Sequence, residues 1–282
     1  MVITTFRIVA FAALAWTLVC PRAEAQDTVT LERTEEVAPA LDRAHHLFYS
    51  GLYETSAALA LDIRMREPSN LAASELRTSA LHFQIRRALG EPKDRGKAWK
   101  LCVICQELMP LFLEEFAIGR AEAQAQLMTD PDNVDTLFFL GKLDLNYVWL
   151  QLATIGRKTG LGEYREARRS LDSVLERQPN HVRAQVARAW IDYIVDTRLP
   201  FGTKWILGGG DKERGLRVVR EAAEAKAARY VRAEARFALW DMQVREKNFR
   251  QAVVTARSLS QDFPENAELV RFVARHDPQG SQ

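Results

Sequence analysis

The stretch Gly51–Pro68, GLYETSAALALDIRMREP, sets a pattern that two later stretches of the chain repeat. These are Gly162–Pro179, GEYREARRSLDSVLERQP, and Lys247–Pro264, KNFRQAVVTARSLSQDFP. In each stretch an aromatic residue lies two positions after the first, a small residue lies three positions further on, and proline comes 17 residues after the start. Regular recurrence of this kind predicts a protein built from repeated helical units.

Each position in the pattern has a mechanical role. A small first residue lets the chain turn, alanine or serine lets two helices approach closely, and proline ends the second helix so that the chain can reverse. The sets are Gly51, Tyr53, Ser56 and Pro68; Gly162, Tyr164, Ala167 and Pro179; and Lys247, Phe249, Ala252 and Pro264, with lysine in the glycine place.

The rest of the chain has the same helical character. From Val37 to Gln106 apolar residues recur at helical spacing, and the β-branched runs typical of strands are absent. The sequence therefore predicts an all-α protein, with Ala98 to Leu108 helical throughout, Asp211 as an N-cap and an over-long helix at 134–157. The other expected helices are 71–89, 111–128, 181–196, 212–225, 228–244, 248–260 and a terminal capping helix at 267–275.

These motifs resemble the tetratricopeptide repeat (TPR) superfamily, whose period is about 34 residues. The resemblance covers 51–70, 162–180 and 247–266, which end as Pro-Ser-Asn, Pro-Asn and Pro-Glu-Asn, and a fourth closure is Asp130–Asn133. It implies an α-solenoid of TPR-like antiparallel helix pairs over 37–275, either as one unit or as two halves, 37–133 and 134–275.

Roughly the last 100 residues also resemble a narrower group, the exported bacterial repeat proteins and, more remotely, the tetratricopeptide repeat protein 39 family. That resemblance implies a helical-repeat scaffold and transfers no catalytic residue. It rests on Trp190–Tyr193, Leu199-Pro200, Gly210-Asp211, Arg214–Leu216 and Ala222-Ala223.

The N-terminus has the pattern of a secretory signal peptide, with Arg7, an apolar run from Ile8 to Cys20, and small residues before a cleavage site after Ala25. The run is too short to span a bilayer. We expect a signal peptide at 1–25, a flexible segment at 26–36, a disordered tail at 276–282, and an exported mature chain without a transmembrane segment. The periplasm is the default compartment and full secretion is the alternative.

The charge balance excludes one class of partner. Lysine and arginine number 39 against 37 aspartates and glutamates, with the signs interspersed. Because phosphate backbones require a concentrated basic field, nucleic-acid binding is not expected.

Cys102-Val103-Ile104-Cys105 is the sharpest local motif. In an oxidising compartment it indicates a structural disulfide or buried thiols, a redox pair, or half of a metal site. Haem attachment would need histidine where Gln106 stands, and one CxxC leaves zinc two ligands short. A disulfide here would close a very small loop and would either distort a helical turn or lie at a helix end.

Other candidate chemistry is weak. The five histidines lack metal-ligand spacing, so we expect no metal and no cofactor. Gly208-Gly209-Gly210-Asp211-Lys212 lacks the hydroxyl residue and the preceding strand of a phosphate-binding loop, which favours a structural turn.

An aromatic and amide cluster on the long helix is the strongest candidate for a ligand site. Polar groups within so apolar a stretch need partners or a ligand. The cluster either lines a partner or ligand groove or forms the hydrophobic centre where two subdomains meet. Its members are Asp144, Asn146, Tyr147 and Trp149, together with Trp190, Asp192, Tyr193 and Trp205.

Three functional hypotheses follow. The first is an exported, non-enzymatic scaffold that binds a protein, peptide or envelope partner through its concave face. The second is a periplasmic carrier of a small apolar or anionic ligand, similar to the TPR partner of TRAP transporters. The third is a thiol redox protein that uses Cys102 and Cys105.

Overall fold

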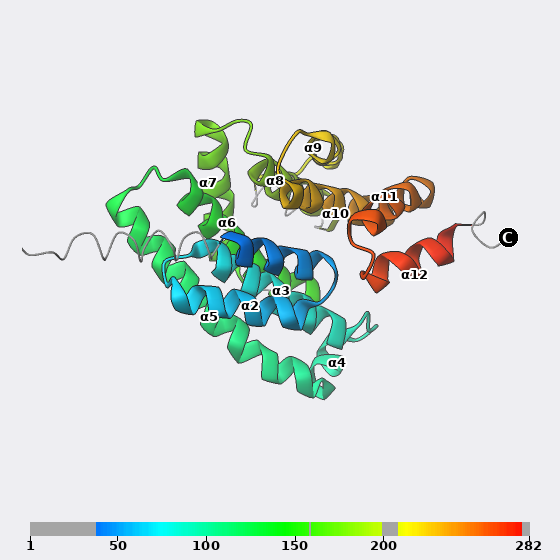
Figure 1. The fold of residues 1–282 in the computed structure, drawn as a ribbon, viewed down its shortest axis with the longest axis horizontal. Helices are drawn as coiled ribbons and strands as arrows, with labels where there is room; N and C mark the ends of the chain where they lie inside the picture. The colour runs from blue at the N-terminus through cyan, green and yellow to red at the C-terminus, as the bar shows by residue number, and fades with distance from the viewer. Residues whose placement is uncertain (1–37, 158, 199–207, 278–282) are drawn as a thin grey trace, which may run out of the picture. The chain divides into compact units, whose positions relative to one another are not determined.

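Helices are the only regular elements in residues 38–157, 159–198 and 208–277, the residues described in this computed structural model (Figure 1). The predicted all-α class is confirmed. The predicted signal peptide at 1–25, the segment 26–36 and Trp205 lie outside the described residues. So do all but the first two residues of the predicted tail, 276–282.

The observed helices agree closely with those expected from the sequence. After a helix at 38–49, they are α2 Tyr53–Arg66, α3 Leu71–Leu89, α4 Arg95–Leu101, α5 Val103–Thr129, α6 Val134–Val148, the π-helix η1 Trp149–Ile155, α7 Leu161–Arg177, α8 Val182–Arg198, α9 Lys212–Glu224, α10 Arg229–Arg245, α11 Phe249–Asp262 and α12 Ala267–His276.

The same turn follows four of the helices, at the Pro-containing segments 67–70, 130–133, 178–181 and 263–266. The residue two positions after each proline donates its backbone N–H to the carbonyl three residues earlier and uses its side chain to cap the next helix. The four residues are Asn70, Asn133, His181 and Asn266, whose backbone bonds to Glu67, Asp130, Gln178 and Phe263 measure 3.0, 3.2, 3.0 and 3.1 Å.

Neighbouring helices pack against one another along the chain. The most extensive contacts join α6 with α7, α2 with α3, α3 with α5, and α8 with α9. The small residues of the repeated pattern lie inside helix contacts, since Ser56 on α2, Ala167 on α7 and Ala252 on α11 are all fully buried. Ser56 Oγ also donates to the carbonyl of Ala44 at 2.9 Å, which ties α2 to the first helix.

The first helix also contacts the C-terminal helices. The ring of Tyr49 stacks on Phe237 of α10 with centroids 5.3 Å apart, and His45 stacks on Tyr230 at 5.5 Å. Asn266, the cap of α12, donates from Nδ2 to the backbone carbonyl of Tyr49 at 2.7 Å. Segments more than 200 residues apart therefore share one hydrophobic cluster.

The structure differs from expectation at three helices. The predicted helix at 134–157 becomes a π-helix from Trp149 and ends at Ile155. Helix α5 begins at Val103, earlier than the expected 111. Helix α12 extends to His276, one residue into the predicted tail, and the imidazole ring of His276 stacks on Phe249. None of the described helices has the length and apolarity that crossing a membrane requires.

Candidate functional site

An open cleft of about 710 Å³ lies between the segment that enters α4 and the residues that follow η1. A smaller hollow of about 490 Å³ adjoins it and shares Trp99, Lys100 and Arg157. The cleft is lined by Pro92, Lys93, Asp94, Arg95, Gly96, Trp99, Lys100, Ile155, Gly156 and Arg157.

Local backbone features fix both walls of the cleft. Asp94 caps α4 by accepting a 2.9 Å hydrogen bond from the backbone N–H of Lys97. On the other wall η1 ends at Gly156, whose φ of 83° is in the left-handed region that favours glycine. The backbone N–H of Arg157 then donates to the carbonyl of Gln151 at 2.8 Å. This hydrogen bond fixes the position of the Arg157 backbone, from which the side chain extends into the cleft.

The cleft is strongly cationic. Lys93, Arg95, Lys100 and Arg157 line it against one carboxylate, Asp94, which already caps α4. Across the described residues none of these four cations takes part in an observed ion pair. The guanidinium of Arg157 lies 5.4 Å from the centroid of the Trp99 ring, a cation–π arrangement. Such a lining can hold an anion and pack an aromatic or other planar group beside it.

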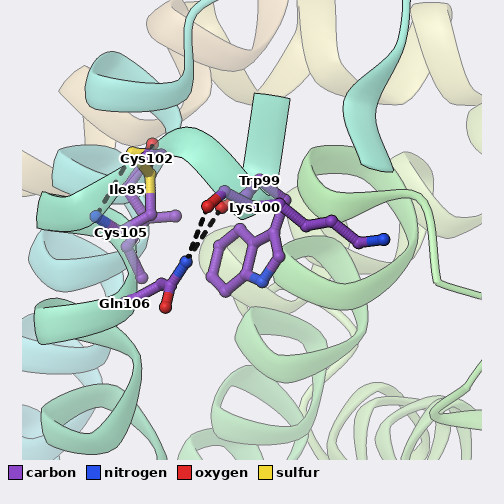
Figure 2. The surroundings of a disulfide bond; sticks show 6 residues. All are labelled: Ile85, Trp99, Lys100, Cys102, Cys105 and Gln106. Carbon is purple, nitrogen blue, oxygen red and sulfur yellow. Dashed lines mark hydrogen bonds between the residues drawn. A yellow bond between two sulfur atoms is a disulfide. The ribbon is translucent and has the colours of Figure 1, made fainter. Parts of the chain in front are cut away.

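A disulfide joins Cys102 and Cys105 next to the cleft (Figure 2). Cys102 lies between α4 and α5 and caps α5, since its sulfur accepts from the backbone N–H of Cys105 at 3.2 Å. The prediction of a continuous helix from Ala98 to Leu108 is therefore wrong at Cys102, which adopts an extended conformation. The bridge lies at a helix end, one of the two positions expected for it.

Gln106 adds a second connection at this junction. Its Nε2 donates to the carbonyls of Trp99 at 3.4 Å and Lys100 at 3.2 Å, and both bonds are drawn in Figure 2. Cys105 is fully buried, with its sulfur 3.8 Å from the carbonyl of Ile85 on α3. The end of α4, which carries Trp99 and Lys100, is thus held against α5 and α3.

The polar residues predicted for a ligand site on α6 have protein partners. Asp144 is fully buried and accepts from Arg120 Nε at 3.0 Å, while its Oδ2 has no hydrogen-bond partner. Burial raises the pKa of Asp144 to about 7, although the Arg120 charge opposes this. Asn146 donates to Thr78 Oγ1 and Ser79 Oγ, both at 2.9 Å, and so ties α6 to α3.

The aromatic candidates divide among three hydrophobic clusters. Tyr147 stacks on Phe116 at 4.8 Å, and Trp149 packs in the cluster between α6, α7 and α8. Trp190 and Tyr193 contact each other edge to face in a third cluster, and the Tyr193 hydroxyl donates to Glu246 at 2.9 Å.

Asp192 completes the described set of predicted site residues. It is mostly buried and pairs with Arg188. Neither hollow described above is lined by any of the predicted groove residues that the structure describes.

A buried charge network lies elsewhere, where the first helices of the predicted pairs meet. Glu75, Lys142, Arg183 and Glu234 come from α3, α6, α8 and α10. Arg183 binds Glu234 at 2.6 Å and Glu75 at 3.2 Å, and Lys142 binds Glu234 at 2.6 Å. Two cations thus balance two carboxylates.

The network keeps its carboxylates ionised and affects the first helix. Burial favours protonation of Glu234, but the Arg183 and Lys142 charges lower its pKa to about 2. His45 of the first helix lies nearby, and burial, assisted by the Arg183 charge, lowers its pKa to about 4. Within the described ranges no group of three or more His, Cys, Asp or Glu residues could hold a metal ion.

Sequence reasoning missed the cleft. Two features of the sequence mark the segments that form it. These are the turn residues Gly90 and Pro92 and the turn residues Thr159-Gly160, each with basic residues nearby. Trp99 and Arg157 are 58 positions apart, and no periodicity indicates that they meet. Compared with protein-family models and with curated proteins, the chain matches none of them.

Proposed function

We propose that this chain is an exported, non-enzymatic binding protein of the TPR type, and that it holds an anionic ligand with a planar group in the cleft at Trp99. The observation that carries the proposal is the guanidinium of Arg157 over the Trp99 ring among three further cations without ion pairs. An anion gains charge-assisted hydrogen bonds there, and a planar group gains contact with the ring.

The repeated turn supports the solenoid part of this proposal. Four closures share one backbone hydrogen bond and one side-chain cap, as expected for units of one kind stacked in series. The fully buried small residues Ser56, Ala167 and Ala252 support it as well.

The cleft is a better candidate site than the concave face expected from the sequence. In a TPR solenoid the first helices of the pairs would line that face. Here the buried network from α3, α6, α8 and α10 satisfies its charges internally. Recognition of a protein or peptide on that face would have to break these ion pairs or use other side chains.

The lining of the cleft favours binding over catalysis. Its cations and its aromatic ring can hold and orient an anion. Its carboxylate, Asp94, accepts from the backbone of α4 and is already committed to capping. These are the groups of a carrier or sensor site.

The experiment is a titration with 8-anilinonaphthalene-1-sulfonate, an aromatic anion that serves as the probe. We expect saturable binding, weakened at least fivefold by Arg157→Ala and by Trp99→Leu, since a cation–π or charge-assisted contact contributes about 1–2 kcal/mol. The matched control Arg250→Ala removes an exposed cation on α11 and should leave the affinity unchanged. Equal affinity in all four proteins would contradict the proposal.

Two mass measurements extend the test. Native mass spectrometry of the purified chain should show an anionic adduct that the Arg157→Ala protein lacks. The intact mass of the chain recovered from cells tests export, because cleavage after Ala25 removes residues 1–25. A chain that retains them argues against the export part of the proposal.

A second candidate is thiol–disulfide exchange, favoured by the position of Cys102 as the N-cap of α5. The helix terminus stabilises a thiolate there. In the reduced protein the Cys102 thiolate would attack one sulfur of a substrate disulfide and break its S–S bond. A mixed disulfide forms, and the other substrate sulfur leaves as a thiolate that takes up a proton. The Cys105 thiol, on losing its proton, would then attack Cys102 and release the substrate as a dithiol.

Insulin reduction by the dithiothreitol-reduced protein tests this candidate. We expect turnover in the unaltered protein and none with Cys102→Ser. Rates equal to those of dithiothreitol alone would exclude it.

A further inference from the structure

The corner between α4 and α5 exposes a cluster of large apolar side chains. Leu101 is 72% exposed, Val103 is 68% exposed and Ile104 is 58% exposed. These three surround Cys102, and the Cys102–Cys105 bridge fixes the backbone that carries them. A rigid corner pays little conformational entropy when it docks, whereas leaving three large apolar groups in water is unfavourable.

Cations lie next to this corner. Lys97 is exposed and is four residues before Leu101 on α4, so the two share a helix face. Lys100 is also exposed and immediately precedes Leu101. Lys93, Arg95 and, from the facing segment, Arg157 bring the number of cations near the corner to five. The same region, 91–107, has three carboxylates, Glu91, Asp94 and Glu107.

Trp99 lies at the base of the corner, half-buried against the cluster of α3 and α5. Its neighbours therefore combine an aromatic ring, exposed aliphatic side chains and lysines within one short segment. Interfacial membrane segments share this composition, because the aliphatic groups enter the boundary of the acyl chains while lysine and tryptophan remain at the headgroups.

We propose that this corner docks the protein on an anionic phospholipid surface. Leu101, Val103 and Ile104 enter the headgroup–acyl boundary, and Lys97 and Lys100 contact lipid phosphates. A bilayer fits better than a protein partner because it accepts exposed apolar side chains without a complementary pocket, and its negative surface complements the cations. The proposal goes beyond the ligand cleft, since the three apolar residues line neither hollow.

The experiment is co-sedimentation with vesicles of phosphatidylglycerol and phosphatidylethanolamine, using the chain as recovered from cells. We expect binding that is stronger than to phosphatidylcholine vesicles and weaker at high salt. The variant L101S/I104S should reduce the partition coefficient at least tenfold. The matched control M65S/M128S replaces two apolar side chains that are 68% and 81% exposed on α2 and at the end of α5, and should bind normally.

The charge contribution is tested in the same assay. K97E/K100E should lose at least tenfold on anionic vesicles, whereas R250E/K226E, which reverses two exposed charges elsewhere, should lose less than threefold. Binding that remains in a variant lacking both the three apolar side chains and the two lysines is subtracted from every value before these ratios are taken. Circular dichroism and an unchanged urea midpoint establish that each variant is folded.

Three outcomes would overturn the inference. They are binding to neutral and anionic vesicles alike, equal loss in L101S/I104S and M65S/M128S, and capture of a soluble protein by the corner without any vesicle binding. Failure here is distinguishable from failure of the cleft, because L101S/I104S should still bind the anilinonaphthalene probe and Arg157→Ala should still sediment with anionic vesicles.

Discussion

Asn266 donates a 2.7 Å hydrogen bond from Nδ2 to the backbone carbonyl of Tyr49, 217 positions earlier in the chain. The side-chain oxygen of Asn266 meanwhile accepts from the backbone N–H groups of Glu268 and Leu269. One buried amide therefore caps α12 and joins it to the first helix.

Asn266→Ala should lower the free energy of unfolding by about 2–3 kcal/mol. A lost cap costs about 1 kcal/mol, and a buried carbonyl left without a donor costs a similar amount or more. Asn133→Ala is the matched control, because Asn133 caps α6 in the same turn without such a long-range bond, and it should cost about 1 kcal/mol. Urea unfolding followed at 222 nm measures both, and equal losses would show that the Tyr49 bond contributes nothing.

Lys247 occupies the glycine place of the third repeated stretch and is the one non-glycine residue with positive φ in the described chain, at 58°. Gly51 holds the corresponding place in the first stretch with φ of 76°. The left-handed conformation costs roughly 1 kcal/mol for a residue with a Cβ. Lys247→Gly should therefore raise stability by about 1 kcal/mol, whereas Gly51→Ala should lower it. A Lys247→Gly protein of lower stability would contradict this account.

The helices could be predicted from the sequence because their boundaries depend on local signals. Pro68, Pro131, Pro179 and Pro264 each occupy the second position of a turn, and the caps at Asn70, Asn133 and Asn266 end three of these turns. The third closure shows the limit of the pattern. Asn180 was expected to complete it, but the residue two positions after Pro179 is His181, whose Nδ1 accepts from the backbone N–H of Ala184 at 3.1 Å.

The candidate site could not be predicted in the same way. The direction of each side chain around α6 depends on which neighbours pack there. Asn146 faces α3, while Tyr147 faces Phe116 of α5. The contact between Arg157 and Trp99 depends on how η1 ends, and a π-helix has no clear sequence signal.

His181 should make its closure sensitive to acid. Burial is the main cause that lowers its pKa, and the neutral ring is the acceptor of the cap. The His181 ring of the unfolded chain takes up a proton near pH 6.5, whereas the ring of the folded chain takes it up only at lower pH. The contribution of the His181 cap to stability is therefore present above pH 6.5 and is lost as pH falls. His181→Asn keeps the cap without titrating, so its stability relative to the unaltered protein should increase between pH 7 and pH 5. A constant difference across that range would contradict the assignment.

Asp144 should give stability the opposite dependence on pH. Burial raises its pKa to about 7, so the folded protein holds a proton that the unfolded chain releases near pH 4. Stability is then lost as pH rises from 4 to 7. Asp144→Asn, which keeps an acceptor for Arg120, should be more stable than the unaltered protein by roughly 1–3 kcal/mol at pH 7.5 and about equal to it at pH 4. Asp132→Asn, at an exposed carboxylate, is the control and should change stability little at either pH.

Arg183 is the center of the buried network, since it binds Glu75 and Glu234 and its guanidinium lies 4.6 Å from the Phe138 ring. Arg183→Leu leaves two buried carboxylates with Lys142 alone. Removing one partner from a buried ion pair costs about 3–5 kcal/mol, because the remaining charge stays desolvated.

Arg236→Leu is the control variant for the loss of stability expected in Arg183→Leu. Arg236 pairs with Asp262, a carboxylate that is 46% exposed, and surface pairs contribute about 0–1 kcal/mol. Acid should bring the stabilities of the two variants closer together. The pKa of Glu234 is lowered to about 2, so the network stabilises the fold above pH 4.5 and this contribution is lost as pH falls toward 2. Urea unfolding between pH 7 and pH 3 should therefore show the cost of Arg183→Leu shrinking with acid while that of Arg236→Leu stays small, and equal costs at pH 7 would mean that the network contributes no more than a surface pair.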